Sequence, residues 1–272
     1  MYEEFYGLAR KPFRMTPDPS FLFRSHSHEE ALARMELAVE ERSIMLLVGE
    51  IGSGKTTLSR VLVDSLTNIK PILIVNPVLT PNQFLRTVAS RLGADKPKYF
   101  KADLVDQVND MVFELNEKGT PPVIIIDEAQ LIPGRSTFEE IRLLTNFQLD
   151  EKNLMTIILM GQPEIEKRLE RKEYEAFRQR LSLLYKLEPL SEKETMTYIE
   201  HRLALAGGKP TIFTMEAKKL IYRLTGGIPR KINNLAGSCL LEGFGRQVKN
   251  IGIDIVENAA KDLGMKEQQQ AA

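Results

Sequence analysis

Eight consecutive residues, from Gly49 to Thr56, have the types and spacing of a phosphate-binding loop. They read G-E-I-G-S-G-K-T, a full match to G-x-x-x-x-G-K-[ST]. The glycines allow a tight turn whose N–H groups face nucleotide phosphates, while Lys55 reaches the β- and γ-phosphates and Thr56 offers its hydroxyl to Mg²⁺. We expect nucleotide contacts from the loop and the residue after it: Gly49, Glu50, Ile51, Gly52, Ser53, Gly54, Lys55, Thr56 and Thr57.

The segments on either side of this loop support the same chemistry. An apolar run at 44–48 predicts a strand before it, and 55–66 predicts a helix after it. Phosphate would then meet a helix N-terminus, where unpaired N–H groups and the helix dipole both favour anions. The sequence therefore predicts binding of a nucleoside triphosphate.

A second chemical feature is the acidic pair Asp127-Glu128, directly after the apolar strand-like run 123–126. A strand that delivers a carboxylate beside a phosphate loop is the Walker-B arrangement, in which Asp127 helps to hold Mg²⁺ through its water shell. Glu128 can orient and deprotonate a water molecule. The pair therefore completes a predicted site for ATP and Mg²⁺.

The elements that must position these residues alternate between strand and helix. We predict strands near 44–48, 72–75, 123–126, 155–160 and 183–187, and intervening helices that include 101–117 and 137–149. The sequence Thr80-Pro81-Asn82-Gln83 predicts a capped helix start. This alternation predicts an α/β fold with a parallel, five-stranded, doubly wound sheet.

The two ends of the chain differ from this core. Pro12, Pro17 and Pro19 argue against a regular helix, so we expect residues 1–25 to form an extended arm in a groove of the main domain. Ser27 to Glu30 predicts a capping box that starts the next helix, as does Ser191 to Glu194. We predict an ATPase domain over 26–189, an all-helical lid over 190–264 with helices near 191–206, 214–225, 229–245 and 253–263, and a disordered tail over 265–272.

The composition limits the classes of protein that this chain can be. Its 37 basic and 37 acidic residues cancel, which excludes a global electrostatic attraction to nucleic acid. The single cysteine, Cys239, excludes an internal disulfide and fits a reducing compartment as a core residue. Neither a signal peptide nor a long apolar stretch is present. We therefore expect a cytoplasmic protein without direct membrane insertion, recruited to the inner membrane, if at all, by a partner.

With Asp127-Glu128-Ala129-Gln130, the chain resembles the ExeA/GspA-like group of AAA+ ATPases, the general secretion pathway protein A family, over nearly its whole length. The N-terminal motif is the most specific to the group. The supporting motifs are Tyr2-Glu3-Glu4-Phe5-Tyr6-Gly7-Leu8, Pro12-Phe13, Thr16-Pro17-Asp18-Pro19-Ser20-Phe21-Leu22, Gly161-Gln162-Pro163-Glu164, Arg178-Gln179-Arg180-Leu181 and Gly226-Gly227-Ile228-Pro229-Arg230.

The resemblance implies roles for four further residues. Gln162 corresponds to the polar sensor that positions the attacking water, with a turn residue as the alternative. Arg180, or else Arg178, corresponds to the arginine finger that reaches the γ-phosphate of a neighbouring subunit, with surface ion pairing as the alternative for either. Arg230 corresponds to the second sensor, which links the helical lid to ATP, with an ordinary helix-surface arginine as the alternative.

Three minor features are open at this stage. The resemblance suggests that His26 and His28 lie near the adenine, but solvated positions at a helix start are equally consistent. Asn146 could reach the phosphates or could be an ordinary polar helix residue. Residues 201–250 carry nine basic and two acidic side chains, a net charge of +7, which fits subunit assembly, a DNA-binding surface or a solvated face.

The resemblance also implies a function. It suggests an oligomeric ATPase, ring or filament, that drives assembly of a membrane-bound secretion or pilus partner such as a secretin. The longer relatives continue into a membrane helix and a peptidoglycan-binding module, so this sequence resembles a stand-alone form. One alternative is an ATP-dependent, DNA-binding regulator similar to the transposition helpers TnsC, TniB and MuB. Another is a signalling switch that oligomerises with ATP and turns over slowly.

Overall fold

The computed structural model describes residues 1–14, 21, 23–149 and 152–266, which pack as two units. One is an α/β unit made of residues 29–49 and 58–187. The other is a helical unit made of residues 1–28, 50–57 and 188–272. Residues 50–57, which include most of the phosphate loop, therefore belong to the helical unit.

The α/β unit is built on a five-stranded parallel sheet, as the sequence predicts. The strand order is β2-β3-β6-β1-β7. The three central strands are buried along their whole length, whereas the edge strand β7 alternates between half-buried and exposed positions up to its buried last residue, Leu187, as expected for central and edge strands. The strands are β1 (Ile44–Gly49), β2 (Lys70–Ile74), β3 (Pro122–Ile126), β6 (Thr156–Gly161) and β7 (Leu181–Leu187).

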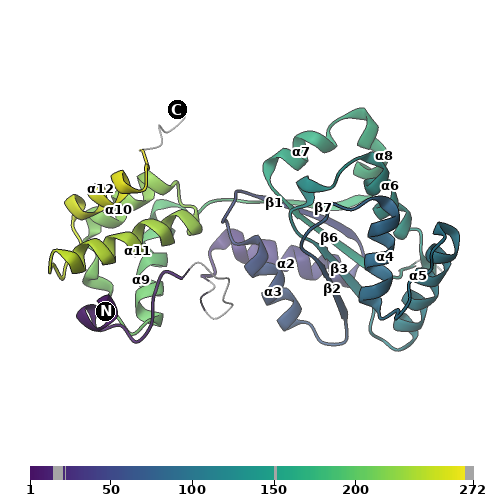
Figure 1. The fold of residues 1–272 in the computed structure, drawn as a ribbon, viewed down its shortest axis with the longest axis horizontal. Coiled ribbons are helices and arrows are strands. Elements are labelled where there is room, and N and C mark those ends of the chain that lie inside the picture. The colour runs from purple at the N-terminus through teal and green to yellow at the C-terminus, as the bar shows by residue number, and fades with distance from the viewer. Residues whose placement is uncertain (15–20, 22, 150–151, 267–272) are drawn as a thin grey trace. The chain divides into compact units, whose positions relative to one another are not determined.

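Helices cover both faces of this sheet (Figure 1). On one face, α2 (His26–Glu40) and α3 (Lys55–Ser65) pack on side chains that include Met45 and Ile125. On the other face, residues of alternate register such as Leu46 and Ile124 pack against a second set of helices. That set comprises α4 (Pro81–Leu92), α5 (Lys101–Glu117), α6 (Arg135–Leu144), α7 (Pro163–Leu169) and α8 (Glu175–Arg178). The doubly wound prediction is confirmed.

The predicted helix over 137–149 is partly wrong. Helix α6 begins earlier, at Arg135, and ends at Leu144. Residues after it form β4 (Gln148–Leu149), which pairs antiparallel with β5 (Lys152–Asn153). The helix ends there because three successive backbone N–H groups donate to the carbonyl three residues earlier rather than four. These are the N–H groups of Thr145, Asn146 and Phe147. The tight turns end the helix before the apolar periodicity ends.

The helical unit contains α9 (Glu192–Leu205), α10 (Met215–Thr225), α11 (Pro229–Gly245) and α12 (Ile253–Asp262), close to the four predicted helices. They share one buried apolar core that includes Cys239. The predicted capping boxes at Thr80 and Ser191 are both present. Among the described residues, every helix is too short or too polar to cross a bilayer.

The start of the chain differs from the extended arm predicted for residues 1–25. Residues Tyr2–Tyr6 form a short helix, α1, which ends at Gly7 in a left-handed conformation. Tyr6 and Phe13 pack into the core of the helical unit, where the Tyr6 hydroxyl donates to the Val248 carbonyl at 2.9 Å. The motif over 16–20 and the tail over 267–272 lie outside the described residues.

The N-terminal cap of helix α2 also differs from the prediction. Helix α2 begins at His26, and Ser25 is its cap, because the His28 N–H donates to Ser25 Oγ at 3.3 Å. Ser27, the predicted cap, instead accepts from the Glu188 N–H at 3.0 Å. The buried Arg202 guanidinium donates to the Pro12 carbonyl at 2.6 Å and fixes the N-terminal segment on α9.

Candidate nucleotide-binding site

The phosphate loop after β1 is folded around its own lysine. Lys55, the first residue of α3, is buried and donates from Nζ to the Glu50 carbonyl at 3.0 Å. The same carbonyl accepts from the Ser53 N–H at 3.1 Å. The Thr57 N–H closes the next turn on the Gly54 carbonyl at 2.9 Å. The loop is therefore compact, with its ammonium group at the centre.

Two other carbonyls of the loop accept hydrogen bonds from donors in the helical unit. The Arg230 N–H, at the start of α11, donates to the Gly52 carbonyl at 3.2 Å. The buried His28 lies with Nε2 at 2.9 Å from the Ser53 carbonyl. Gly52 has φ +83°, and a Cβ there would lie 2.3 Å from the Arg230 Cβ, so only glycine fits. These contacts hold the carbonyl side of the loop.

One buried side-chain oxygen of the loop has no hydrogen-bond partner among the described residues. The Ser53 hydroxyl is buried, and its oxygen makes no such bond in that part of the chain. A buried hydroxyl without a partner is costly, and a phosphate oxygen is an acceptor of the kind that would satisfy it. Ile51, by contrast, exposes about half of its side chain. The loop therefore fits a phosphate ligand.

Within the α/β unit, the acidic pair lies at the same edge of the sheet as the start of the loop. Ile126 is level with Leu159, and Val48 is level with Gly161. The carboxyl ends of three parallel strands therefore meet at one edge. This places Gly49, Asp127 and Gln162 at that edge, because each ends or follows one of these strands.

Glu128 is held by two glutamines. Gln130 Nε2 donates to Glu128 Oε2 at 2.6 Å, and Gln162 Nε2 donates to the same oxygen at 3.1 Å. Gln130 Oε1 in turn accepts from the Gln162 N–H at 3.1 Å. The structure thus joins Glu128 and Gln162, both selected from the sequence, directly and also through Gln130, to which the sequence analysis gave no role. Its place in the Asp-Glu-Ala-Gln run was the available signal.

Asp127 has the environment of a metal-binding carboxylate. It is buried, and its Oδ1 accepts from the Glu128 N–H at 2.9 Å. Its own N–H donates to the Ile74 carbonyl at 2.9 Å and so continues the sheet. Carboxylate and hydroxyl oxygens are the hard donors that Mg²⁺ prefers, so the residues chosen for the metal, Thr56 and Asp127, fit that ion chemically.

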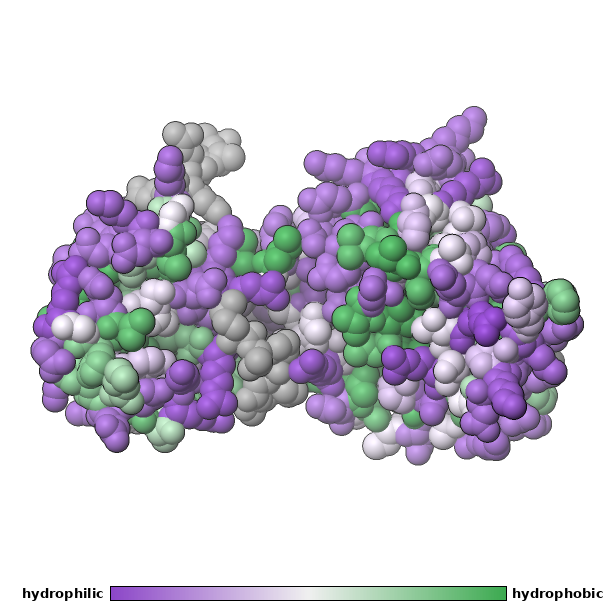
Figure 2. All heavy atoms as spheres, viewed as in Figure 1, coloured by the Kyte–Doolittle hydropathy of each residue, from purple (hydrophilic) through white to green (hydrophobic). Residues whose placement is uncertain are grey.

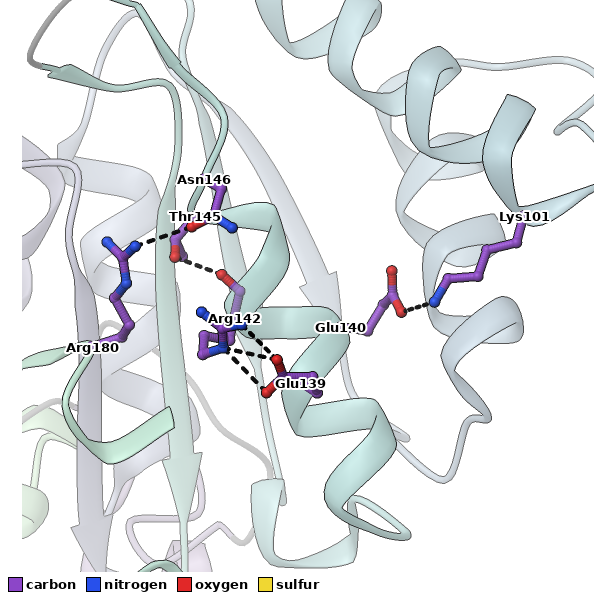
Figure 3. Close-up of polar contacts among 7 residues, drawn as sticks. All are labelled: Lys101, Glu139, Glu140, Arg142, Thr145, Asn146 and Arg180. Carbon is purple, nitrogen blue, oxygen red and sulfur yellow. Dashed lines mark hydrogen bonds and ion pairs between the residues drawn. The ribbon is translucent and has the colours of Figure 1, made fainter. Parts of the chain in front are cut away.

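The two candidate arginine fingers lie at the opposite end of the sheet. Arg180 and Arg178 are exposed and precede β7, whose first residue is level with Ile44, the first residue of β1. Six-residue β1 separates this end from Gly49 by about 15–20 Å. Arg180 donates to Asn146 Oδ1 at 3.1 Å (Figure 3). Asn146 therefore pairs with Arg180, and the phosphate contact considered for it stays a prediction.

The basic surface of the helical unit is smaller than its sequence suggests. Lys218 is buried and pairs with Glu200 at 2.6 Å. Arg202 is also buried. Arg246 pairs with Glu242 at 2.5 Å and lies 3.7 Å from Asp254. Several of the nine basic side chains therefore serve the unit's own packing.

Comparison with known proteins agrees with this geometry. The family described as AAA domain matches residues 38–169. General secretion pathway protein A of Aeromonas hydrophila is 38% identical over 251 residues. The chain is an ExeA/GspA-like protein of the AAA type. That alignment covers 90% of this chain and 45% of the relative, so the ExeA/GspA-like chain spans less than half of its relative's length.

Solved structures share the fold of this ExeA/GspA-like protein. The ORC2 protein of Aeropyrum pernix superposes with a TM-score of 0.70 at 17% identity, over 96% of this chain and 73% of that one. The RuvB branch migration motor of Thermotoga maritima gives 0.60 at 20% identity, over 93% and 73%. These likenesses confirm a P-loop AAA fold followed by a helical part.

Proposed function

We propose that this ExeA/GspA-like protein is a Mg-dependent ATPase. The observation that carries the proposal is the carboxylate of Glu128, held by two amides at the sheet edge where β1 leads into the phosphate loop. In this account the loop N–H groups and Lys55 bind the phosphates. Thr56 and Asp127 hold the metal ion, which when bound neutralises phosphate charge.

Hydrolysis requires a base and a group that places the water. Glu128 is the proposed base, and the Gln162 amide, which already contacts it, is the proposed sensor that orients the water. Both amides on the Glu128 oxygen must give way for that oxygen to accept a proton from water. We infer that this carboxylate changes partners when ATP binds. The Aeropyrum ORC2 neighbour was itself solved with ADPNP and ADP.

The experiment that tests the proposal is the substitution Glu128→Gln. Loss of the base is expected to lower turnover by about 10²–10⁴-fold, while Mg-ATP still binds, because the loop and Asp127 are intact. Steady-state phosphate release and calorimetric titration with Mg-ATP measure the two effects. Glu170→Gln, at an exposed position after α7, is the matched control and should behave as wild type. Turnover by the Glu128→Gln protein at the wild-type rate would refute the assignment.

We further propose that ATP completes an oligomer. Arg180, with Arg178 as the second choice, lies at the far end of its own sheet, so a catalytic role requires the site of another subunit. Arg230 would sense ATP from the helical lid, since its backbone contacts the loop at Gly52. Apolar side chains are available for assembly, because Leu73, Val75 and Val78 are exposed at the β2 edge, and Figure 2 shows apolar residues gathered on the visible face of the α/β unit.

The partner that we propose is a membrane-bound secretion component. This rests on the name of the Aeromonas relative and on the match along 90% of this chain. In this proposal the partner recruits the ATPase to the inner membrane. DNA is the weaker alternative, because burial and pairing of Lys218, Arg202 and Arg246 reduce the basic surface that would bind phosphates.

A further inference from the structure

His28 is a buried histidine whose two ring nitrogens both have partners. Its side chain is about 5% exposed. Nδ1 lies 2.6 Å from Ser25 Oγ, and Nε2 lies 2.9 Å from the Ser53 carbonyl in the phosphate loop. His26, two residues earlier on the same helix, is exposed, and its backbone N–H donates to Glu194 Oε1 at 3.3 Å. His28 alone of this pair faces the loop.

The chemistry of the partners fixes the protonation of the ring. A carbonyl oxygen can only accept, so Nε2 must carry the hydrogen and donate to Ser53. Nδ1 of the neutral ring is then an acceptor, and the Ser25 hydroxyl donates to it while accepting from the His28 N–H. Every polar atom in this chain of contacts is satisfied by the neutral tautomer. Burial also lowers the pKa of His28, which favours the same form.

The contact sets the direction of one peptide group in the loop. In a trans peptide, the C=O and the next N–H point in opposite directions. Holding the Ser53 carbonyl against the ring therefore aims the Gly54 N–H away from His28, to the other side of the loop. Gly54 has φ +108°, and a Cβ on it would lie 3.0 Å from Nε2, so the ring and this glycine fit each other closely.

We propose that His28 is a positioning residue for nucleotide binding: its Nε2–H anchors the Ser53 carbonyl and so presents the Gly54 N–H to phosphate. The inference rests on the proposed function, since it assumes that the loop binds a nucleotide. His28 does not touch the phosphates itself. Its effect is on affinity, through the conformation of the loop.

The first test needs no nucleotide. In His28→Leu the donor is lost, whereas in His28→Gln the side-chain amide restores a donor near the position of Nε2. Hydrogen exchange of the full chain without nucleotide should show faster exchange in the peptide that covers 50–57 for His28→Leu, and near wild-type exchange for His28→Gln. His26→Leu is the matched control and should leave this peptide unchanged. Circular dichroism checks that each variant is folded.

The second test is calorimetric titration with Mg-ATP. We expect His28→Leu to weaken binding about 5–10-fold, the effect of one lost hydrogen bond, and His28→Gln to stay close to wild type. A folded His28→Leu protein with wild-type exchange and affinity would overturn the proposal, as would His28→Gln behaving like His28→Leu. If the wild type itself binds no Mg-ATP, the proposed function fails, and the exchange experiment still decides the role of His28 in the loop.

Discussion

Glu128 combines a strained backbone with a carboxylate whose Oε2 accepts two hydrogen bonds. Its φ of +52° lies in the left-handed region, which costs a residue other than glycine about 1–2 kcal/mol. The N–H of Glu128 bonds the Asp127 side chain, and its carboxylate accepts from Gln130 and Gln162. Charge-assisted bonds of this kind offset the strain. Strain at the residue that we propose as the base is consistent with a functional position.

The thiol of Cys239 should be unreactive in the folded protein. The thiol is fully buried in the core of the helical unit, and burial raises its pKa to about 12. Since the thiolate is the reactive form, we expect almost no reaction with a thiol reagent at neutral pH while the protein is folded. The measurement is the rate of labelling with and without denaturant. Labelling of the folded protein as fast as of a free cysteine peptide would contradict the burial.

Some residues of the candidate site can be identified from a local sequence pattern, and others only from the fold. The loop around Lys55 and the pair at Asp127 carry their chemistry in adjacent residues, so the sequence predicts them directly. Gln130 and His28 contact segments that are distant in the sequence, at Gln162 and Ser53. A lone histidine at a helix start has many possible partners, and only the fold selects Ser53. Sequence patterns therefore predict the reacting groups better than the groups that hold them.

At the scale of elements, the turn between α10 and α11 depends on Gly227. It has φ +72°, and a Cβ there would lie 1.9 Å from the Leu190 carbonyl oxygen. We expect Gly227→Ala to destabilise the helical unit by more than about 2 kcal/mol, because the backbone must move or strain. Thermal unfolding measures the change.

The control for this prediction is Gly245→Ala. Gly245 ends α11, and nothing lies within 4 Å of an added Cβ. Alanine there should be neutral or should stabilise by about 0.5–1 kcal/mol, since it restricts the unfolded chain. Equal unfolding temperatures for the two variants would contradict the close approach at Leu190.

The sequence predicts the elements of this fold well where burial sets the pattern. Central strands such as β3 are covered on both faces and therefore read as continuous apolar runs. Prediction from sequence fails where a local turn, or packing against a distant segment, determines the backbone conformation. Residues Tyr2–Tyr6 form a helix although the proline-rich segment after them favours extension, because Tyr6 is buried against the helical unit. Likewise, α2 is capped by Ser25 and not by the predicted Ser27.

At the scale of the whole molecule, the position of Arg180 predicts complementation between subunits. An Arg180→Ala subunit keeps Glu128, and a Glu128→Gln subunit keeps Arg180. Each protein alone should be nearly inactive, whereas a mixture should regain part of the activity, because some sites combine the intact Glu128 of one subunit with the intact Arg180 of another. Phosphate release from the mixture measures this. If mixing restores nothing although light scattering shows mixed oligomers, Arg180 is not a finger supplied by a neighbour.

The central claim is that the loop around Lys55 binds the phosphates of Mg-ATP. The most direct measurement is calorimetric titration of Mg-ATP into the wild type and into Lys55→Met, which removes the ammonium group and keeps an unbranched side chain of similar size. The account predicts saturable binding by the wild type and a loss of at least about ten-fold in affinity for the variant, since a charged contact to phosphate is lost. Equal affinities, or no binding by the folded wild type, would contradict it.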